Sequence, residues 1–285
     1  MNAPAYDSKE QDVLDYLLPN GTRIVIHQDS STPDSTGRTI WLGAQVLAVY
    51  LDDVLKSSNR RPGRRPRIVD VGAGTGLCSL ALASIGSFDI LSTDLELIVD
   101  GVLARNIAAN RSTLNCNRAS DQARVETKVL DWFQAPEQWQ WNHPNDDNEA
   151  DEPLGPPFDF VVSADTIYVP ELIQPLLRTL RALSTTESSP SFASVPVYVA
   201  LEVRDPALVA EFLRSAEEDW DFKSARVDHA KLKRLVESKE SGLGWEDESA
   251  WEGVEIWKLK SRKPRAKKNT RWKKDDGDGN GDNQG

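Results

Sequence analysis

Side chains that form disulfides or soft metal sites are scarce in this chain of 285 residues, which has two cysteines and three histidines. Cys78 and Cys116 supply neither a disulfide framework nor a zinc site, and Cys78 lies in an apolar run where a small buried residue is expected. His27, His143 and His229 are far apart and match no catalytic or zinc pattern. We therefore expect no metal site, and the scarcity of cysteine favours a reducing compartment.

Long apolar segments are also missing. No stretch approaches the roughly 20 apolar residues that a membrane-spanning helix needs. Residues 1–11 are polar and lack the apolar core of a secretory signal. We therefore expect no membrane partner and a location in the cytoplasm, the nucleus or both. The length and the apolar content of 39% suit one large α/β domain with appendages.

Acidic residues outnumber basic ones along most of the chain, and the balance reverses only near the C-terminus. The net charge is −11, but from Lys258 onward ten Lys and Arg face four Asp, so the preceding residues carry −17. An acidic body is unsuited to binding nucleic acid and favours a basic protein partner. We expect residues 261–285 to be a disordered tail, first basic and then acidic. Its basic part is a candidate for nuclear import or for contact with RNA, or it is simply a solvated tail.

The most informative feature that is present is a strand-like segment that leads into three alternating glycines and an apolar, helix-like segment. The glycines permit positive φ angles and a close approach to a ligand, and the first turn of the following helix presents free N–H groups. In the dinucleotide pattern G-x-G-x-x-G the third glycine comes one residue later, which makes a nicotinamide oxidoreductase the weaker alternative. The spacing G-x-G-x-G after an acidic strand end resembles the S-adenosylmethionine loop of class I methyltransferases. The segment reads Arg67-Ile-Val-Asp70-Val-Gly72-Ala73-Gly74-Thr-Gly76-Leu77.

Acidic residues follow further strand-like segments. Asp94 ends the apolar segment 89–93, at about the distance from the glycines where such folds place a ribose-binding carboxylate. The segment 158–163 leads to Asp165, and Tyr168 follows three residues later. Because open α/β sheets bind ligands at the C-terminal ends of their strands, both acids are candidate site residues.

Two tryptophans are candidates for the cofactor pocket. Trp132 follows the end of the third strand-like segment, and its ring either packs on an adenine or anchors its loop. Trp41 either closes the pocket from the N-terminal side or pins its segment to the sheet.

Alternating apolar patterns predict a mostly parallel, twisted sheet with helices on both faces. The dipeptide Asn20-Gly21 between two apolar segments predicts an N-terminal β-hairpin. The acidic segments 134–157 and 237–253 are predicted to be long loops that either meet a basic substrate or are merely solvated. A late antiparallel edge pair is predicted at 221–227 and 254–259, with a short helix near 230–236 between them. The other predicted strands cover 67–71, 89–93, 125–130, 158–163 and 195–203, and the other helices 39–51, 77–84, 97–110, 171–183 and 206–218.

Together these motifs resemble the family-16, seven-β-strand protein-lysine methyltransferases. The resemblance extends from the hairpin near Val13 to Leu259, and the motif Asp165-x-x-Tyr168 is its most specific part. Asp70 stands where many members have Glu, and the basic tail lies outside the resemblance. The matching segments are 40–44, 70–77, 93–94, 130–132, 164–168 and Glu171.

The resemblance implies a class I, Rossmann-like fold with a seven-stranded sheet. It places a methyltransferase domain at 37–260, after an N-terminal extension at 1–36 that holds the hairpin. It implies S-adenosyl-L-methionine as the cofactor and a lysine side chain of a protein as the acceptor, and we expect a monomer. The implied catalytic residues are Asp165 and Tyr168, and the implied cofactor contacts are Trp41, Asp70, Gly72, Ala73, Gly74, Gly76, Asp94, Trp132 and Ala164.

Segments 131–132, 201–204 and 254–259 look closest to the branch of the family that methylates a nuclear zinc-finger nucleic-acid-binding protein. A nucleic-acid-binding or translation-related substrate is therefore a hypothesis. A small-molecule methyltransferase and a non-catalytic binding module of the same fold remain alternatives. For a lysine acceptor, our hypothesis is that Asp165 and Tyr168 orient the ammonium and that its proton is lost to water before attack.

Overall fold

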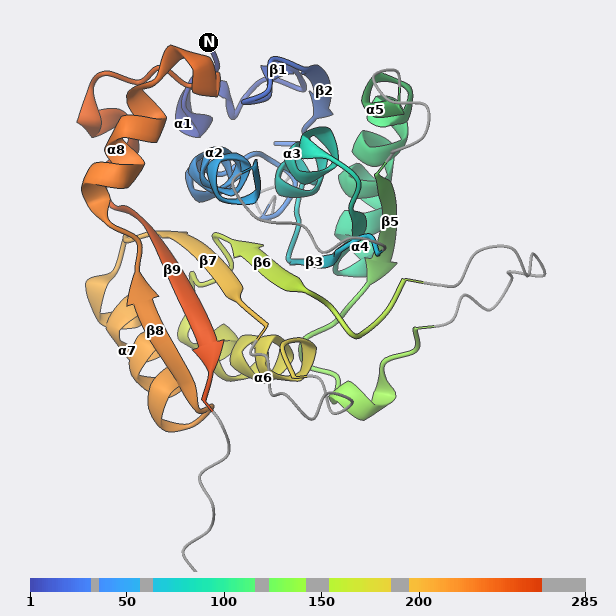
Figure 1. The fold of residues 1–285 in the computed structure, drawn as a ribbon, viewed down its shortest axis with the longest axis vertical. Coiled ribbons are helices and arrows are strands. Elements are labelled where there is room, and N and C mark those ends of the chain that lie inside the picture. Colours follow the sequence, from blue (N-terminus) through green and yellow to red (C-terminus); the bar gives the residue numbers. More distant parts are fainter. Residues whose placement is uncertain (32–35, 57–63, 116–122, 142–153, 186–194, 263–285) are drawn as a thin grey trace, which may run out of the picture.

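The computed structural model describes residues 1–31, 36–56, 64–115, 123–141, 154–185 and 195–262 (Figure 1). Its centre is a seven-stranded sheet in the order β5-β4-β3-β6-β7-β9-β8. The first five strands in that order are parallel, and β9 is antiparallel to both of its neighbours. The strands are β3 (Arg67–Val71), β4 (Asp89–Asp94), β5 (Arg124–Val129), β6 (Phe160–Ala164), β7 (Val197–Glu202), β8 (Phe222–Arg226) and β9 (Val254–Ser261).

The strand order reverses at the centre of the sheet. From β3 the chain moves outward to β4 and β5, and it then returns to form β6 on the other side of β3. Such a switch point leaves a crevice outside the C-terminal ends of the strands, where open α/β sheets bind their ligands. The predicted α/β class, the seven strands, the mainly parallel sheet and the late antiparallel pair are confirmed.

Helices cover both faces of the sheet, as predicted (Figure 1). Along β3, alternate side chains enter different cores, because successive residues of a strand point to opposite faces. Ile68 belongs to the core beneath the first set of helices, whereas Val69 and Val71 belong to the other core. The first set consists of α2 (Leu42–Lys56), α3 (Leu77–Ile85), α5 (Ala104–Asn115) and α8 (His229–Glu237), and the second of α6 (Ile173–Leu183) and α7 (Pro206–Glu218).

The predicted hairpin is present and packs on the first set of helices. It consists of β1 (Val13–Leu17) and β2 (Arg23–His27), which pair with Val13 opposite His27 and Leu17 opposite Arg23. Gly21 in its turn has a φ of +83°, a conformation that few other residues adopt easily. A short helix, α1 (Ala5–Ser8), precedes the hairpin. The fully buried side chains of Leu18, Ile24 and Ile26 join the same core as α2 and α3.

Several predicted boundaries differ from the observed ones. The helix predicted at 97–110 is α4 (Glu96–Ile98), a π-helical turn (Val99–Leu103) and α5, which continues to Asn115. Gly101 lies inside the π-helical turn. Strand β9 reaches Ser261, the first residue of the predicted tail. The predicted domain limits stay predictions. So does the predicted disorder of the tail, because residues 263–285 lie outside the described part of the chain.

The interpretation of 237–253 as a solvated loop is wrong. This segment contains two short 3₁₀ helices, Lys239–Ser241 and Glu248–Trp251. Leu243 and Trp251 are each only 1% exposed and belong to the core beneath α2. The segment thus buries its apolar side chains, while Glu246, Asp247 and Glu252 remain exposed.

The acidic segment 134–157 is only partly described. It begins with a 3₁₀ helix, Pro136–Gln138, and the Trp141 ring packs edge-on against Phe158 with ring centroids 6.1 Å apart. Residues 142–153 of this segment lie outside the described part of the chain.

No described helix has the combined length and apolar character that a membrane span requires.

Candidate functional site

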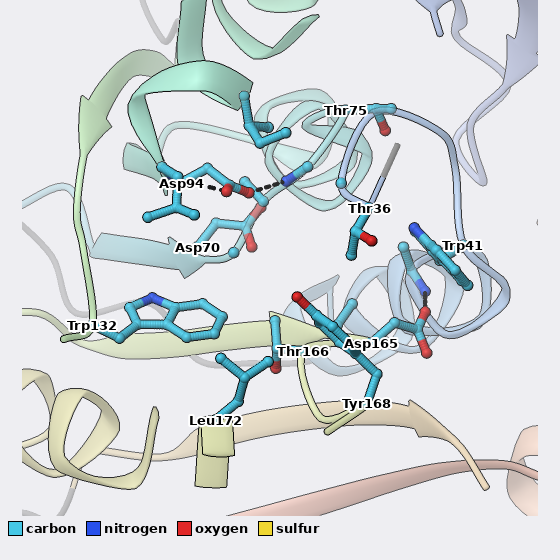
Figure 2. A pocket seen from close by; sticks show the side chains of 18 of the residues that line it. Thr36, Trp41, Asp70, Thr75, Asp94, Trp132, Asp165, Thr166, Tyr168 and Leu172 are labelled. Carbon is cyan, nitrogen blue, oxygen red and sulfur yellow. Dashed lines mark hydrogen bonds between the residues drawn. The ribbon is translucent and has the colours of Figure 1, made fainter. Parts of the chain in front are cut away.

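A cavity of about 350 Å³ opens at the switch point of the sheet (Figure 2). Its walls come from the segments that follow β3, β4, β5 and β6, and from the residues that precede α2. Ten of the eleven predicted site residues line it, and Gly76 does not. The ten are Trp41, Asp70, Gly72, Ala73, Gly74, Asp94, Trp132, Ala164, Asp165 and Tyr168.

The glycine segment turns sharply between β3 and α3. Gly72 and Gly74 have φ angles of +69° and +56°. A Cβ atom on Gly72 would lie 2.6 Å from Cγ2 of Thr166, and one on Gly74 would lie 2.9 Å from the carbonyl oxygen of Gly37. Side chains at these two positions would therefore disturb the cavity wall as well as strain the backbone.

Gly76 has a different surrounding from the other two glycines. It is the N-cap residue of α3 and has a φ of +83°. A Cβ atom there would lie 2.8 Å from Cδ1 of Leu103, in the packed region around α5. The structure thus places Gly76 in the turn to α3 and not in the cavity wall, and its contact with the cofactor stays a prediction.

Asp94 is held by two backbone groups at the end of β4. Its Oδ2 atom accepts a hydrogen bond from the Gly74 N–H and its Oδ1 atom accepts one from the Leu95 N–H, both at 2.8 Å. Burial raises the pKa of the Asp94 carboxyl to about 6, and the two hydrogen bonds oppose this rise because they favour the charged form. The carboxyl is therefore fixed in orientation at the cavity wall.

Asp70 lies deeper, with only 1% of its surface exposed. The Ser79 hydroxyl donates a hydrogen bond to Oδ2 of Asp70 at 2.8 Å. Burial raises the pKa of the Asp70 carboxyl to about 7, the Ser79 hydrogen bond opposes the rise, and the nearby charge of Asp94 adds to it. A cation placed in the cavity beside Asp70 would restore the charged form of this carboxyl.

The Asp165 carboxylate is tied to two other elements instead of pointing freely into the cavity. Its Oδ2 atom accepts a hydrogen bond from the Ala44 N–H in α2 at 3.2 Å, and its Oδ1 atom accepts one from the Glu202 N–H in β7 at 3.1 Å. A Cβ atom on Gly43 would lie 2.5 Å from Oδ1, so glycine is required where α2 passes the carboxylate. Burial raises the pKa of Asp165 to about 6. This residue also has a φ of +54°, a conformation that aspartate adopts more readily than most residues with a side chain.

Tyr168 enters the cavity from the loop that follows β6. Figure 2 shows its ring reaching toward the middle of the cavity, on the side opposite Asp70 and Asp94. Half of the residue is exposed. Burial raises the pKa of the Tyr168 phenol, and the charge of Asp94 raises it further, so the hydroxyl remains a hydrogen-bond donor at neutral pH.

The two candidate tryptophans lie on different walls of the cavity (Figure 2). The Arg178 side chain donates to the Trp132 carbonyl oxygen at 2.7 Å, which anchors the loop, while the ring edge approaches Gly72. Trp41 lines the cavity and also contacts cations, because the Arg204 guanidinium lies 4.6 Å from its ring centroid and Lys9 Nζ 5.6 Å. Trp41 therefore both closes the cavity and anchors its own segment.

Sequence reasoning missed part of the wall and a second cavity. Leu95, Leu97 and Phe133 line the main cavity, and each is more than half exposed. The signal in the sequence was their position, because large apolar residues directly follow the candidate residues Asp94 and Trp132. The second cavity, of about 160 Å³, adjoins the first and includes Glu202 and Arg204. Their pattern Glu-x-Arg at the end of a strand was visible in the sequence, but nothing in it indicated a cavity.

Within the described ranges, no group of three or more His, Cys, Asp or Glu side chains is arranged to hold a metal ion.

The chain is similar to known lysine methyltransferases. A family model described as lysine methyltransferase matches residues 19–219. The protein-lysine N-methyltransferase rrg1 of Schizosaccharomyces pombe is 28% identical over 157 residues, which are 54% of this chain and 45% of that protein. The protein-lysine methyltransferase METTL21E of Mus musculus is 28% identical over 146 residues, which are 51% of each. The chain thus spans about half the length of these curated relatives.

A solved structure can be added to these relatives. The TehB-like SAM-dependent methyltransferase of Corynebacterium glutamicum superposes with a TM-score of 0.41 and 16% identity, covering 76% of this chain and 87% of that one. A likeness this distant does not inform the function.

Proposed function

The chain belongs to the lysine methyltransferase family, and we propose that it transfers a methyl group from S-adenosyl-L-methionine to a lysine side-chain amine of a protein. The observation that carries this proposal is the cavity at the switch point, where Asp70 and Asp94 lie opposite Tyr168 (Figure 2). One wall thus offers groups for a nucleoside cofactor, and the other offers groups for an acceptor.

The residues around the cavity fit the cofactor. The Asp94 carboxyl, oriented by two backbone N–H groups, is placed to accept hydrogen bonds from ribose hydroxyls. Asp70 supplies a buried carboxyl for the ammonium group of the methionine part, and Trp132 supplies a ring for the adenine. Gly72 leaves room that a side chain would fill. When bound, the cofactor supplies a methyl group on a positively charged sulfur, which leaves as a neutral thioether after attack by an amine.

The acceptor must lose a proton before it can attack, because a lysine amine has a pKa of about 10.4 in water. The Asp165 and Glu202 carboxylates, which line the cavities beside Tyr168, attract the charged form of the lysine side chain. The Tyr168 hydroxyl and ring then orient the nitrogen, while its proton passes to water. Asp165 holds the start of α2 and the end of β7 in place around the acceptor, through the two hydrogen bonds that its carboxylate accepts. In this account Asp165 is a positioning residue.

The proposal is tested by methyl transfer in vitro. The purified chain is incubated with isotope-labelled S-adenosylmethionine and a lysate from the source organism in which the gene has been deleted. We expect label on lysine side chains of one or a few proteins, identified by mass spectrometry. Label confined to small molecules, or no label despite measurable binding of S-adenosylhomocysteine, would overturn the proposed acceptor.

Affinity for S-adenosylhomocysteine should depend on pH. Only the charged carboxylates bind the ammonium and accept two hydroxyl hydrogen bonds, and the pKa values of Asp70 and Asp94 are about 7 and about 6. As the pH falls below 7 these groups take up protons that bound ligand must displace, so the affinity should fall by up to about tenfold per pH unit for each group. Calorimetric titration between pH 5.5 and 8.5 measures this. Asp70→Asn should remove the step near pH 7, and a flat profile for the unmodified chain would contradict the assignment.

Gly43→Ala should reduce methyl transfer without unfolding the protein. The new Cβ would lie 2.5 Å from Oδ1 of Asp165, so the carboxylate must move away from the backbone groups that it holds. We expect at least about a tenfold loss of kcat, since small misplacements of site residues have large effects on rate. Gly101→Ala is the matched control, because a Cβ there meets nothing within 4 Å. It should leave the rate unchanged, and an equal rate for both variants would refute the role given to Asp165.

A further inference from the structure

The second cavity begins where the cofactor cavity ends. The two cavities share Thr36, Trp41, Asp165 and Tyr168. Tyr168 and Asp165 therefore stand between the space assigned to the cofactor and a groove of about 160 Å³ formed by the end of β7 and the start of α7. A side chain in that groove would reach the cofactor cavity past Tyr168.

The charges around the groove are three carboxylates and one guanidinium. Two of the carboxylates are occupied by backbone groups: Asp165 as described above, and Asp205, which accepts from the Ala207 N–H at 2.9 Å and caps α7. The third, Glu202, forms an ion pair with Arg204, whose side chain is 52% exposed. The Arg204 guanidinium at the same time lies over the Trp41 ring.

We propose that this groove binds the side chain of the target lysine, with Glu202 as the anion that receives its ammonium and Trp41 as the wall along which it lies. This inference rests on the proposed function and extends it to the acceptor side. A cation above an indole ring and beside a partly buried carboxylate is a favourable arrangement, and here Arg204 provides it. Because 52% of the Arg204 side chain is exposed, it can turn toward solvent, where its charge is hydrated, and leave its place to the lysine.

Bisubstrate analogues test the groove without knowledge of the protein substrate. In these compounds a nitrogen replaces the sulfur of S-adenosylhomocysteine and carries a chain of two to four carbons that ends in an ammonium or, in the control series, in a methyl group. For the best chain length, we expect the ammonium compound to bind about tenfold more tightly than its methyl counterpart. Glu202→Gln should remove most of this advantage and leave the Kd of S-adenosylhomocysteine unchanged.

Two further variants separate local from general effects of charge. Glu218→Gln removes the same charge from an exposed ion pair with Arg214 on α7, outside both cavities, and should keep the full advantage. Arg204→Ala should keep or increase it. An equal advantage with and without Glu202, or no advantage at any chain length, would overturn the inference. Failure of the unmodified chain to bind S-adenosylhomocysteine would instead refute the proposed function, and with it the groove.

A separate set of contacts connects the N-terminal hairpin to the glycine segment. Asn106 and Asn110, one turn apart on α5 and both buried, bind the backbone of β2 as a neighbouring strand would. Asn110 accepts from the Val25 N–H at 2.9 Å and donates to its carbonyl oxygen at 2.7 Å. Asn106 does the same with His27, at 2.8 and 3.0 Å.

Unlike Asn110, Asn106 also contacts the glycine segment. Its Nδ2 atom also donates to the Thr75 carbonyl oxygen at 2.9 Å, whereas Asn110 donates to the Asn106 carbonyl oxygen. Thr75 lies within the glycine segment and lines the cofactor cavity. We infer that Asn106 is a positioning residue for the cofactor-binding turn, and that it makes the hairpin a structural part of the cofactor site.

The two asparagines form a matched pair for testing this. Asn106→Ala and Asn110→Ala each remove a buried amide and two hydrogen bonds to β2, but only the first frees the Thr75 carbonyl. Both should lower the Tm. Measured at a temperature where both variants are folded, the Kd of S-adenosylhomocysteine should rise by about tenfold for Asn106→Ala and by less than about twofold for Asn110→Ala.

Aspartate variants cover the case in which an alanine variant does not fold. Asn106→Asp keeps the acceptor for the His27 N–H and loses the donor to Thr75, and Asn110→Asp is its counterpart. Equal Kd values for the Asn106 and Asn110 variants of either pair would show that Asn106 serves only the fold.

Discussion

Asp94→Ala should weaken the binding of S-adenosylhomocysteine by about a hundredfold or more, because two hydrogen bonds between a carboxylate and the ribose hydroxyls are lost. The same change releases the Gly74 and Leu95 N–H groups that Asp94 holds at 2.8 Å. The ligand therefore loses direct contacts and also the ordered turn against which it packs. Isothermal titration calorimetry at pH 8, where the carboxyl is charged, measures the effect.

Glu96→Gln is the control for this prediction. Glu96 carries the same charge two residues later and is exposed. Its replacement should change the Kd by less than about twofold, because exposed charges are screened by solvent and salt. A similar loss in both variants would mean that Asp94 acts through general charge. An unchanged Kd in Asp94→Ala would remove Asp94 from the cofactor site.

Asp165→Ala should reduce the rate of methyl transfer by at least about a hundredfold while the Kd of S-adenosylhomocysteine changes by less than about tenfold. The Ala44 and Glu202 N–H groups would lose their acceptor, and the start of α2 would no longer be held against the end of β7. Leaving these two groups unpaired should lower the free energy of unfolding by about 2–4 kcal/mol. Alanine is also less tolerant than aspartate of the φ of +54° at this position.

Single-turnover measurements at saturating cofactor separate loss of chemistry from loss of binding, and thermal unfolding measures the cost in stability. Asp165→Asn keeps one acceptor oxygen and should retain more stability than alanine. Full transfer activity in the alanine variant would show that the carboxylate has no part in arranging the acceptor side. A rate loss explained entirely by unfolding would limit its role to the fold.

The elements with strong local signals were predicted from the sequence almost to the residue. The strand at 67–71 and the helix that begins at Pro206 have the expected bounds. Proline at the first helical position, after Asp205 as an N-cap, is a local signal that favours the start of α7 at this point. The cofactor wall was predictable for a similar reason, because glycine spacing and strand-end acids are local patterns.

What the sequence did not reveal depends on contacts between distant segments. Gly76 shares its pattern with Gly72, and only the packing of Leu103 against it shows that it belongs to the turn into α3. The buried Trp251 lies in an acidic stretch whose composition indicates exposure. The clamped Asp165 is the most important case, since its partners are 121 and 37 residues away in the chain. A motif spacing cannot show whether such a carboxylate faces a substrate or holds two elements together.

If the chain carries out the proposed methylation of lysine in proteins, deletion of its gene should change lysine methylation in cells of the source organism. Quantitative mass spectrometry should show one or a few lysines that lose methylation on deletion. Methylation should return with the unmodified chain and not with Asp94→Ala or Asp165→Ala expressed at the same level. An unchanged set of methylated lysines after deletion would mean that the chain does not methylate lysine in cellular proteins, and recovery with the Asp94→Ala chain would mean that it does so without this cofactor site.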